Sequence, residues 1–207
     1  QPQCRAERLL MRAALAAPRD ERRRVVGRHG LQHVRGPFPV ELPMIPGNGV
    51  GGWLDGRRVV VSGSGNVATY AVAKAQDFGA RVVACSDSSG YVVDEAGIDL
   101  ALLQQVKEVE RARIAVYAER RASAHHVEGG SIWDVDAEVA LPCATQNELD
   151  EAAAVRLVRT GLVAVAEGAN MPTTPAATRV LQQAGVLGDR RQSGEGADGG
   201  RGREQAR

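Results

Sequence analysis

Several scarcities in the sequence narrow the class of protein. The 207 residues contain only three cysteines, Cys4, Cys85 and Cys143, which lie far apart and match no C-x-x-C spacing. A disulfide framework or a structural zinc site is therefore not expected, no metal site is predicted, and a reducing cytoplasm fits best. No apolar run approaches the length of a membrane span, so we predict no membrane partner. A chain of this length can bury one core without disulfides or metals.

Lysine is equally scarce, because Lys74 and Lys107 are the only two in the chain. Residues 1–53 contain nine arginines and no lysine. An Arg-rich flank of this kind is compatible with a nucleic-acid-binding arm. GC-rich DNA translated out of frame also yields Arg, Gly, Ala and Pro, and we favour this second interpretation. A nucleic-acid partner is therefore not expected.

Periodic patterning begins at Leu54 and fades after Leu187. Short apolar runs predict four buried strands, at residues 58–62, 81–85, 138–141 and 163–166. Helical spacing predicts four helices, at residues 66–78, 99–121, 148–159 and 175–184, with Asn147 capping the third and Gly79 ending the first. Residues 87–97 are expected to form a small hairpin, and His125 and His126 are expected in a loop or on the surface.

This order of elements predicts an α/β fold class, since a strand, a helix and a second strand within about 30 residues form a βαβ unit with parallel strands. We expect a doubly wound, mostly parallel, Rossmann-like sheet that is incomplete and has disordered flanks. The expected organisation is a poorly ordered segment over 1–53, one domain over 54–187 and a disordered tail over 188–207. The chain starts at Gln1 without a methionine, which indicates a fragment.

The motif that carries chemistry is Gly63-Ser64-Gly65-Asn66-Val67-Ala68, which fits G-x-G-x-x-[GA] between a predicted strand and a predicted helix. The first glycine permits a tight turn, the second lets the backbone approach a pyrophosphate, and the small sixth residue lets the helix lie against the sheet. The amides of the first helical turn then face the anion. Without its βαβ context the pattern is weak, and an ordinary glycine-rich turn is the alternative.

An acidic residue, Asp87, ends the second predicted strand 24 residues after Gly63. An acid at this place usually binds the adenosine ribose and favours NAD. Here Ser88 and Ser89 follow it, and they can donate to a 2′-phosphate. Lys107 and Arg113, on the next predicted helix, are candidate cations for that phosphate. The alternative for Lys107 is a solvated charge that pairs with Glu110.

The middle of the chain resembles the NADP-specific glutamate dehydrogenases of the Glu/Leu/Phe/Val dehydrogenase family. The resemblance covers residues 54–187, and its matching segments are Val59–Ala68, Ala84–Ser88, Ile132–Asp134, Ala140–Leu149 and Ala164–Thr174. It implies the reversible oxidation of L-glutamate to 2-oxoglutarate and ammonia with NADP as cofactor. It also implies a homo-hexameric assembly.

The resemblance further implies roles for individual residues. Asn66, beside the glycines, is similar to a cofactor ligand, and Ser64, Asp87 and Ser88 stand where NADP-using members bind the adenosine ribose and its phosphate. Ala144, Thr145 and Asn170 resemble residues that line the nicotinamide ribose and ring. Together with Gly63, Gly65, Val67, Lys107 and Arg113, these residues form the predicted cofactor site.

Departures from the family pattern concern catalysis. Family members carry an upstream substrate domain with two lysines and an aspartate, whereas residues 1–53 contain no lysine and only one aspartate, Asp20. We therefore assign no catalytic residue, and expect L-glutamate or 2-oxoglutarate to bind only if that domain is supplied. The chain is expected to be truncated or frameshifted at both ends and inactive alone. The alternative is a non-catalytic dinucleotide-binding module, a pseudoenzyme.

Overall fold

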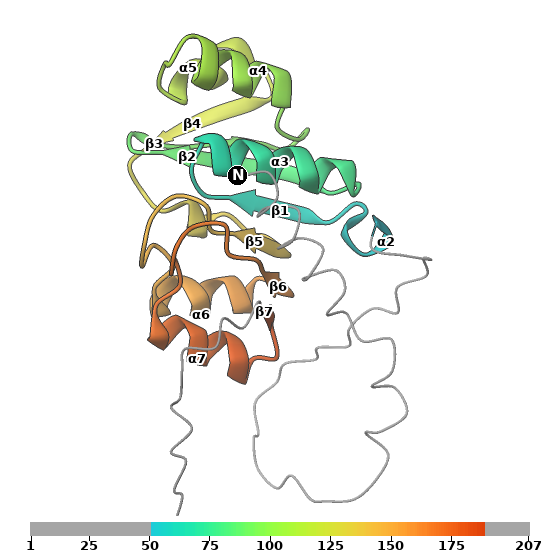
Figure 1. Ribbon diagram of the computed structural model, residues 1–207, viewed down its shortest axis with the longest axis vertical. Coiled ribbons are helices and arrows are strands. Elements are labelled where there is room, and N and C mark those ends of the chain that lie inside the picture. The colour runs from blue at the N-terminus through green and yellow to red at the C-terminus, as the bar shows by residue number, and fades with distance from the viewer. Residues whose placement is uncertain (1–50, 189–207) are drawn as a thin grey trace, which may run out of the picture.

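The structure, a computed structural model, describes residues 51–188. It forms one open sheet of seven strands in the order β4-β3-β2-β1-β5-β6-β7 (Figure 1). Strands β2, β1, β5, β6 and β7 run parallel, and β3 runs antiparallel to both of its neighbours, β2 and β4. The predicted α/β class and the mostly parallel, Rossmann-like sheet are confirmed. The expectations for the two flanks concern residues 1–50 and 189–207, which lie outside the described residues.

The strands have these bounds: β1 Arg58–Val61, β2 Arg81–Asp87, β3 Gly90–Asp94, β4 Ala124–Glu128, β5 Val139–Leu141, β6 Ala164–Val165 and β7 Leu187–Gly188. The helices and helical turns are α2 Gly51–Leu54, α3 Asn66–Asp77, α4 Leu100–Gln104, η2 Gln105–Val109, α5 Ala115–Arg120, η3 Ile132–Asp134, α6 Glu151–Arg159 and α7 Pro175–Gln183. All four strands predicted from apolar runs are present. A hairpin is present, but its first arm is β2 itself, which pairs antiparallel with β3 across Ser88 and Ser89, so only its turn and second arm lie within the predicted residues 87–97.

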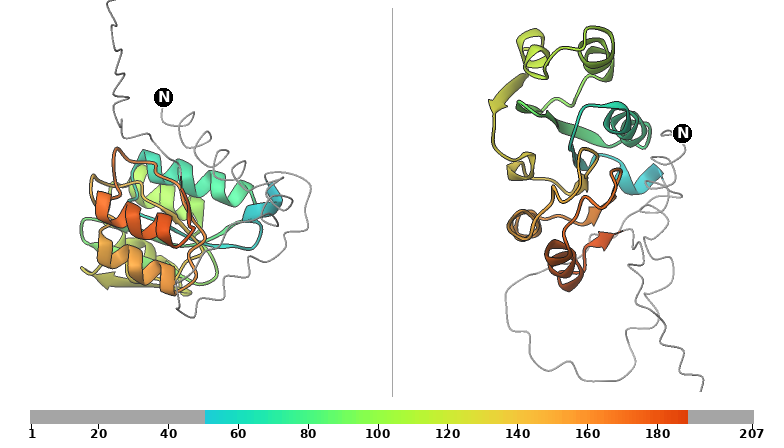
Figure 2. Two further views of the ribbon diagram at one scale, coloured as in Figure 1. Left: turned by 90° about the horizontal axis from the view of Figure 1, so that it is seen from below. Right: turned by 60° about the vertical axis from the view of Figure 1, so that its left-hand side comes forward.

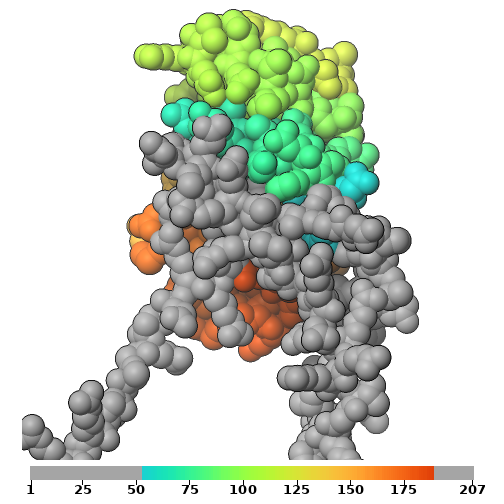
Figure 3. Space-filling model, turned by 45° about the vertical axis from the view of Figure 1, so that its right-hand side comes forward, coloured from blue at the N-terminus to red at the C-terminus, as the bar shows by residue number. Residues whose placement is uncertain are grey.

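Two apolar cores lie on opposite faces of the sheet, because successive side chains of a strand point to opposite faces. Val59 and Val61 of β1 join the core under α3, α4 and α5, whereas Val60 joins the core under α6 and α7. Figure 2 shows α3 on one side of the strands and α6 and α7 on the other. In the space-filling view, α4 and α5 form one end of the described domain and α7 the other (Figure 3). The doubly wound arrangement follows from this alternation.

The helix expected over residues 99–121 is not continuous. It consists of α4, the π-helical turn η2 and, after a break, α5, with Arg111 in the left-handed region at φ 54°. The break brings two donors, the Lys107 ammonium and the Ile114 amide, to the carboxylate of Asp87. It also leaves the apolar side chain of Val109 69% exposed. Tertiary hydrogen bonds outweigh helix propensity at this point.

The third helix starts later than predicted, because its N-cap is Asp150 and not Asn147. The Asp150 carboxylate accepts a hydrogen bond from the Ala153 amide at 2.8 Å, as an N-cap side chain does. Asn147 instead lies in a turn with φ 56°, and its amide donates to the carbonyl of Met171. The last helix begins as predicted at Pro175, with Thr174 as its cap.

The sequence analysis did not predict the short elements α2 and β7, nor strand β4. His125 and His126, expected in a loop or on the surface, lie in this strand and pair with Val93 and Val92 of β3. They point to opposite faces, since His125 is exposed and His126 is half-buried. The segment lacks the β-branched run that marks the other strands, so only its pairing with β3 reveals it. No group of three potential metal ligands occurs within residues 51–188.

Candidate dinucleotide site

The glycine-rich turn lies where the strand order reverses, because β1 has β2 on one side and β5 on the other. In doubly wound sheets, ligands bind at the carboxyl ends of the strands at this point. Gly63 follows β1 with φ 84°, a conformation that favours glycine, and Gly65 is the N-cap of α3. No side chain among the described residues caps α3, and its first turn contains no acidic residue. The first amides of α3 are therefore available to an anion.

The surroundings of Gly63, Gly65 and Ala68 in the glycine-rich motif explain why each position has a small residue. A β-carbon added at Gly63 would lie 3.2 Å from Cβ of Ala144, so this glycine permits a close approach between two loops. A β-carbon added at Gly65 would have no described atom within 4 Å, so the backbone there is open to a ligand. Ala68 is buried against the sheet. The turn thus leaves its backbone open at Gly65 and packs closely at Gly63 and Ala68.

Ser86, near the end of β2, fixes the glycine turn. Its hydroxyl accepts a hydrogen bond from the Gly63 amide at 2.8 Å, and its own amide donates to the Gly63 carbonyl at 3.4 Å. Sequence reasoning did not select Ser86, although it lies within the Ala84–Ser88 segment that carries the family resemblance. Its role depends on a contact between residues 23 positions apart in the chain.

Asp87 is saturated by protein donors. Its carboxylate accepts hydrogen bonds from the amide and hydroxyl of Ser89, from Lys107 Nζ at 2.8 Å and from the Ile114 amide at 2.9 Å. Burial alone raises the pKa of Asp87, but these hydrogen bonds outweigh it and hold the pKa well below its usual value. The Asp87 carboxylate is thus negatively charged, and both of its oxygens already accept hydrogen bonds from the protein. The alternative pairing of Lys107 with Glu110 is absent here, since Glu110 pairs with Arg120.

Two cationic side chains, Arg113 and Lys107, lie close to Ser88 and Asp87. Arg113 donates to the Ser88 hydroxyl at 2.5 Å, and both side chains are exposed. Lys107, whose side chain is 15% exposed, lies against Asp87 and also donates to the carbonyl of Ala112. The structure therefore brings Asp87, Ser88, Lys107 and Arg113 together beyond the end of β2.

The remaining predicted residues lie around the glycine turn and the carboxyl ends of β5 and β6. Ala144 and Thr145 are exposed in the loop after β5, and Asn170 is exposed in the turn after β6. The two loops run side by side, because the Asn147 and Leu149 amides donate to the carbonyls of Met171 and Pro172. Within the motif itself, Ser64 is buried, Val67 is half-buried and Asn66 is exposed at the start of α3.

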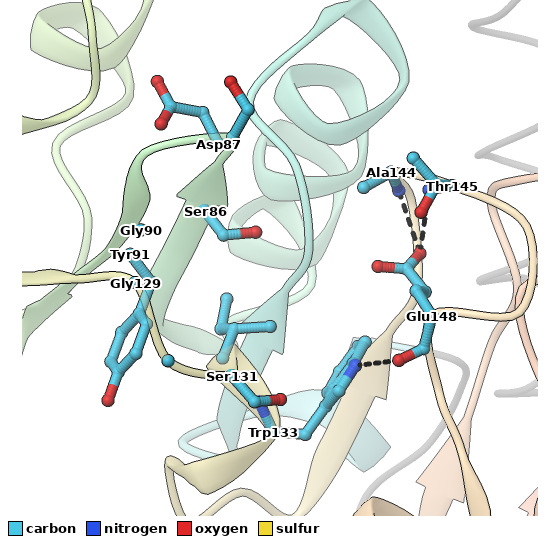
Figure 4. A pocket seen from close by; sticks show the side chains of 13 residues that line it. Ser86, Asp87, Gly90, Tyr91, Gly129, Ser131, Trp133, Ala144, Thr145 and Glu148 are labelled. Carbon is cyan, nitrogen blue, oxygen red and sulfur yellow. Dashed lines mark hydrogen bonds between the residues drawn. The ribbon is translucent and has the colours of Figure 1, made fainter.

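A cleft of about 370 Å³ extends from Asp87 and Ser88 to Ala144 and Thr145, with Tyr91 and Trp133 among its lining residues (Figure 4). Glu148 also lines it, and a carboxylate oxygen accepts hydrogen bonds from the amides of Ala144 and Thr145. Burial raises the pKa of the Glu148 carboxyl above its usual value. Tyr91, Trp133 and Glu148 were not selected as site residues, although Trp133 and Glu148 lie in segments that carry the resemblance.

Cys143 adjoins this site but is not a nucleophile. Its thiol is buried, and burial raises the thiol pKa far above its usual value. A thiol of this kind is inert. The Cys143 side chain instead packs against Gly168, because a β-carbon added at that glycine would lie only 2.5 Å from Sγ of Cys143.

An open, mostly parallel sheet with helices on both faces and a glycine-rich turn at its switch point defines a Rossmann-like α/β domain. The chain belongs to the Glutamate/Leucine/Phenylalanine/Valine dehydrogenase family, whose sequence model matches residues 48–189.

Individual relatives agree with this assignment. The chain is 53% identical over 147 residues to the NADP-specific glutamate dehydrogenase of Escherichia coli K12, covering 70% of this chain and 32% of the relative. It is 50% identical over 137 residues to the NAD(P)-specific glutamate dehydrogenase of Xylanibacter ruminicola, covering 65% of this chain and 31% of the relative. The chain thus spans about a third of the length of these curated relatives.

Solved structures show the same fold. The crystal structure of Plasmodium falciparum glutamate dehydrogenase superposes with a TM-score of 0.62 at 37% identity, covering 64% of this chain and 29% of that chain. A hetero-hexameric glutamate dehydrogenase from Thermus thermophilus superposes with a TM-score of 0.51 at 29% identity, covering 65% and 30%.

Proposed function

We propose that residues 54–187 form the NADP-binding domain of a glutamate dehydrogenase. The complete enzyme would convert L-glutamate, water and NADP⁺ to 2-oxoglutarate, ammonia and NADPH. The observation that carries the proposal is the uncapped start of α3 behind Gly63 and Gly65, at the switch point of the sheet. The names of the relatives support the choice of NADP and of glutamate.

At the adenosine end, we assign the 2′-phosphate of NADP to Ser88, Arg113 and Lys107. Two cations and a hydroxyl donor lie together there, and charge-assisted hydrogen bonds suit a phosphate. Asp87 does not oppose this assignment, because Lys107 and the Ile114 amide already compensate its charge. Its carboxylate orients Lys107 and holds the break before α5.

At the other end, we assign the nicotinamide ribose and ring to Ala144, Thr145 and Asn170, with Gly63 and Gly65–Val67 binding the pyrophosphate between the two halves. When bound, the nicotinamide supplies the group that accepts or donates a hydride. The amino acid must be held over that ring and a base must take its proton. The two lysines of the chain are not placed for this, because Lys74 lies in the last turn of α3 and Lys107 pairs with Asp87.

Assembly and location are part of the proposal. A homo-hexamer is proposed by analogy with the family, and the hetero-hexameric relative from Thermus thermophilus supports an assembly of six subunits. A cytoplasmic location is supported by Cys85 and Cys143, which are both free thiols. No helix in the described part of the chain is long and apolar enough to cross a membrane. L-Glutamate or 2-oxoglutarate would bind once the substrate domain is supplied.

Neither described lysine, Lys74 nor Lys107, is placed to act on a substrate, which also favours a second candidate, a dinucleotide-binding module without catalysis. We expect the purified 207-residue chain to bind NADPH more tightly than NADH and to show no glutamate oxidation. Fluorescence titration with each cofactor and an absorbance assay for NADPH formation measure both properties. Glutamate turnover by the chain alone would contradict the inactivity and exclude the second candidate, and failure to bind either cofactor would contradict the site.

Cofactor selectivity tests the phosphate assignment directly. Replacing Arg113 by alanine should weaken NADPH binding by about tenfold, the value of one charge-assisted contact, and leave NADH binding unchanged. Arg113 is preferable to Lys107 for this test, since removing Lys107 would also deprive Asp87 of a partner. Arg159→Ala, an exposed arginine on α6, is the matched control. Equal losses for NADPH and NADH would show that Arg113 does not contact the 2′-phosphate.

A further inference from the structure

We propose that Glu148 is a positioning residue that holds the Ala144–Thr145 turn in the conformation that binds the nicotinamide half of NADP(H). The inference rests on the proposed function and adds a residue to it. Glu148 lies between β5 and α6, outside the glycine-rich motif. Its part in the site follows from its hydrogen bonds and not from the glycine-rich motif.

The side chain of Glu148 reaches back to the turn that precedes it. Its Oε1 accepts hydrogen bonds from the Ala144 amide at 3.0 Å and from the Thr145 amide at 3.3 Å (Figure 4). Both donors belong to exposed residues of a short loop, which can adopt several conformations when its amides are bound only to water. A carboxylate that accepts both amides selects one conformation.

The main chain of Glu148 is fixed independently. The indole Nε1 of Trp133 donates to the Glu148 carbonyl at 3.0 Å, and the following residue, Leu149, is fully buried. Figure 4 shows the Trp133 ring and the two amides on opposite ends of the Glu148 residue. Because the backbone of Glu148 is held in place, its carboxylate has a defined position, and the two amides that bind it are held there as well.

The turn is also coupled to the glycine motif. The buried hydroxyl of Ser62 accepts hydrogen bonds from the Cys143 amide at 2.8 Å and the Ala144 amide at 3.3 Å, and it interacts with the Glu148 carboxylate. Ser62 immediately precedes Gly63, and a β-carbon added at Gly63 would lie 3.2 Å from Cβ of Ala144, so the two loops pack closely here. A displaced Ala144 would therefore change the distance between the pyrophosphate site and the nicotinamide site.

The test compares two ligands on the full 207-residue chain. NADPH spans both halves of the site, whereas adenosine 2′,5′-bisphosphate occupies only the adenosine half. We expect Glu148→Ala to weaken NADPH binding by about tenfold, the equivalent of one or two hydrogen bonds, and to leave binding of the bisphosphate unchanged. Glu148→Gln retains an oxygen acceptor and should lose less than about threefold. Glu151→Ala, an exposed acid at the start of α6, is the matched control.

Each other outcome contradicts the inference. Unchanged NADPH affinity in Glu148→Ala, or an equal loss for both ligands, would mean that Glu148 does not act on the nicotinamide half. A loss in Glu148→Gln as large as that in Glu148→Ala would assign the effect to charge and not to the hydrogen bonds. Failure of the unsubstituted chain to bind either ligand would overturn the proposed function itself, and the inference with it.

Discussion

Replacing Gly65 by valine should abolish NADPH binding without unfolding the protein. Gly65 has φ −83° and ψ −175°, an extended conformation that valine adopts readily, and no described atom lies within 4 Å of the added β-carbon. The isopropyl group would occupy the space through which a pyrophosphate reaches the amides of α3. Affinity should fall by at least about 100-fold, since both the close approach and the amide contacts are lost. Fluorescence titration with NADPH measures the loss.

Two controls separate a blocked site from a damaged fold. Thermal unfolding of Gly65→Val should stay within a few degrees of the unsubstituted chain, because nothing is displaced in the folded state. Gly188→Val tests valine at another open glycine, in β7, and should leave NADPH binding unchanged. If Gly65→Val still binds NADPH, the pyrophosphate does not bind at this turn, and the proposed cofactor site is wrong.

Replacing Gly90 by alanine should cause the largest loss of stability from a single methyl group. Gly90 has φ 146°, and a β-carbon there would lie only 2.1 Å from the carbonyl oxygen of Val127. That oxygen belongs to β4, which pairs with β3 along five residue pairs, so the clash cannot be relieved without separating the strands. We expect the free energy of unfolding to fall by about 3 to 4 kcal/mol, from steric overlap plus an unfavourable φ.

Gly129 supplies the matched control for Gly90. It also has a positive φ, 65°, but a β-carbon there meets no described atom within 4 Å. Gly129→Ala should therefore cost only about 1 kcal/mol, the intrinsic cost of the left-handed region. Chemical denaturation of both variants measures the difference. Similar costs for the two substitutions would show that backbone conformation, and not the contact between β3 and β4, makes Gly90 necessary.

Much of the fold follows from local sequence. The apolar runs that include Val59–Val61 and Val139–Leu141 predict strands buried on both faces, and Gly63 and Gly65 between a strand and a helix predict the turn. These features are local, because strand, turn and helix preferences act over a few neighbouring residues. The positions of Asp87, Ala144 and Asn170 at strand ends follow from the same reasoning.

Where the sequence analysis failed, a distant contact decides the conformation. The break before α5 exists because Lys107 and Ile114 bind Asp87, 20 and 27 residues away. Strand β4 exists because β3 offers it a free edge, although His125 and His126 have no strong strand preference. Glu148 became recognisable as part of the site only through its contacts with Ala144 and Thr145.

The sequence by itself thus determined the class of the domain, its family and the location of the glycine turn, since each depends on the types and spacing of neighbouring residues. The tertiary structure decided which charges remain available, because the negative charge of Asp87 is compensated by Lys107, which lies 20 residues further along the chain. It also decided which side chains hold the cleft in shape, among them Ser86 and Glu148. Hydrogen bonds across a fold depend on distances in space, and spacing along the chain does not encode them.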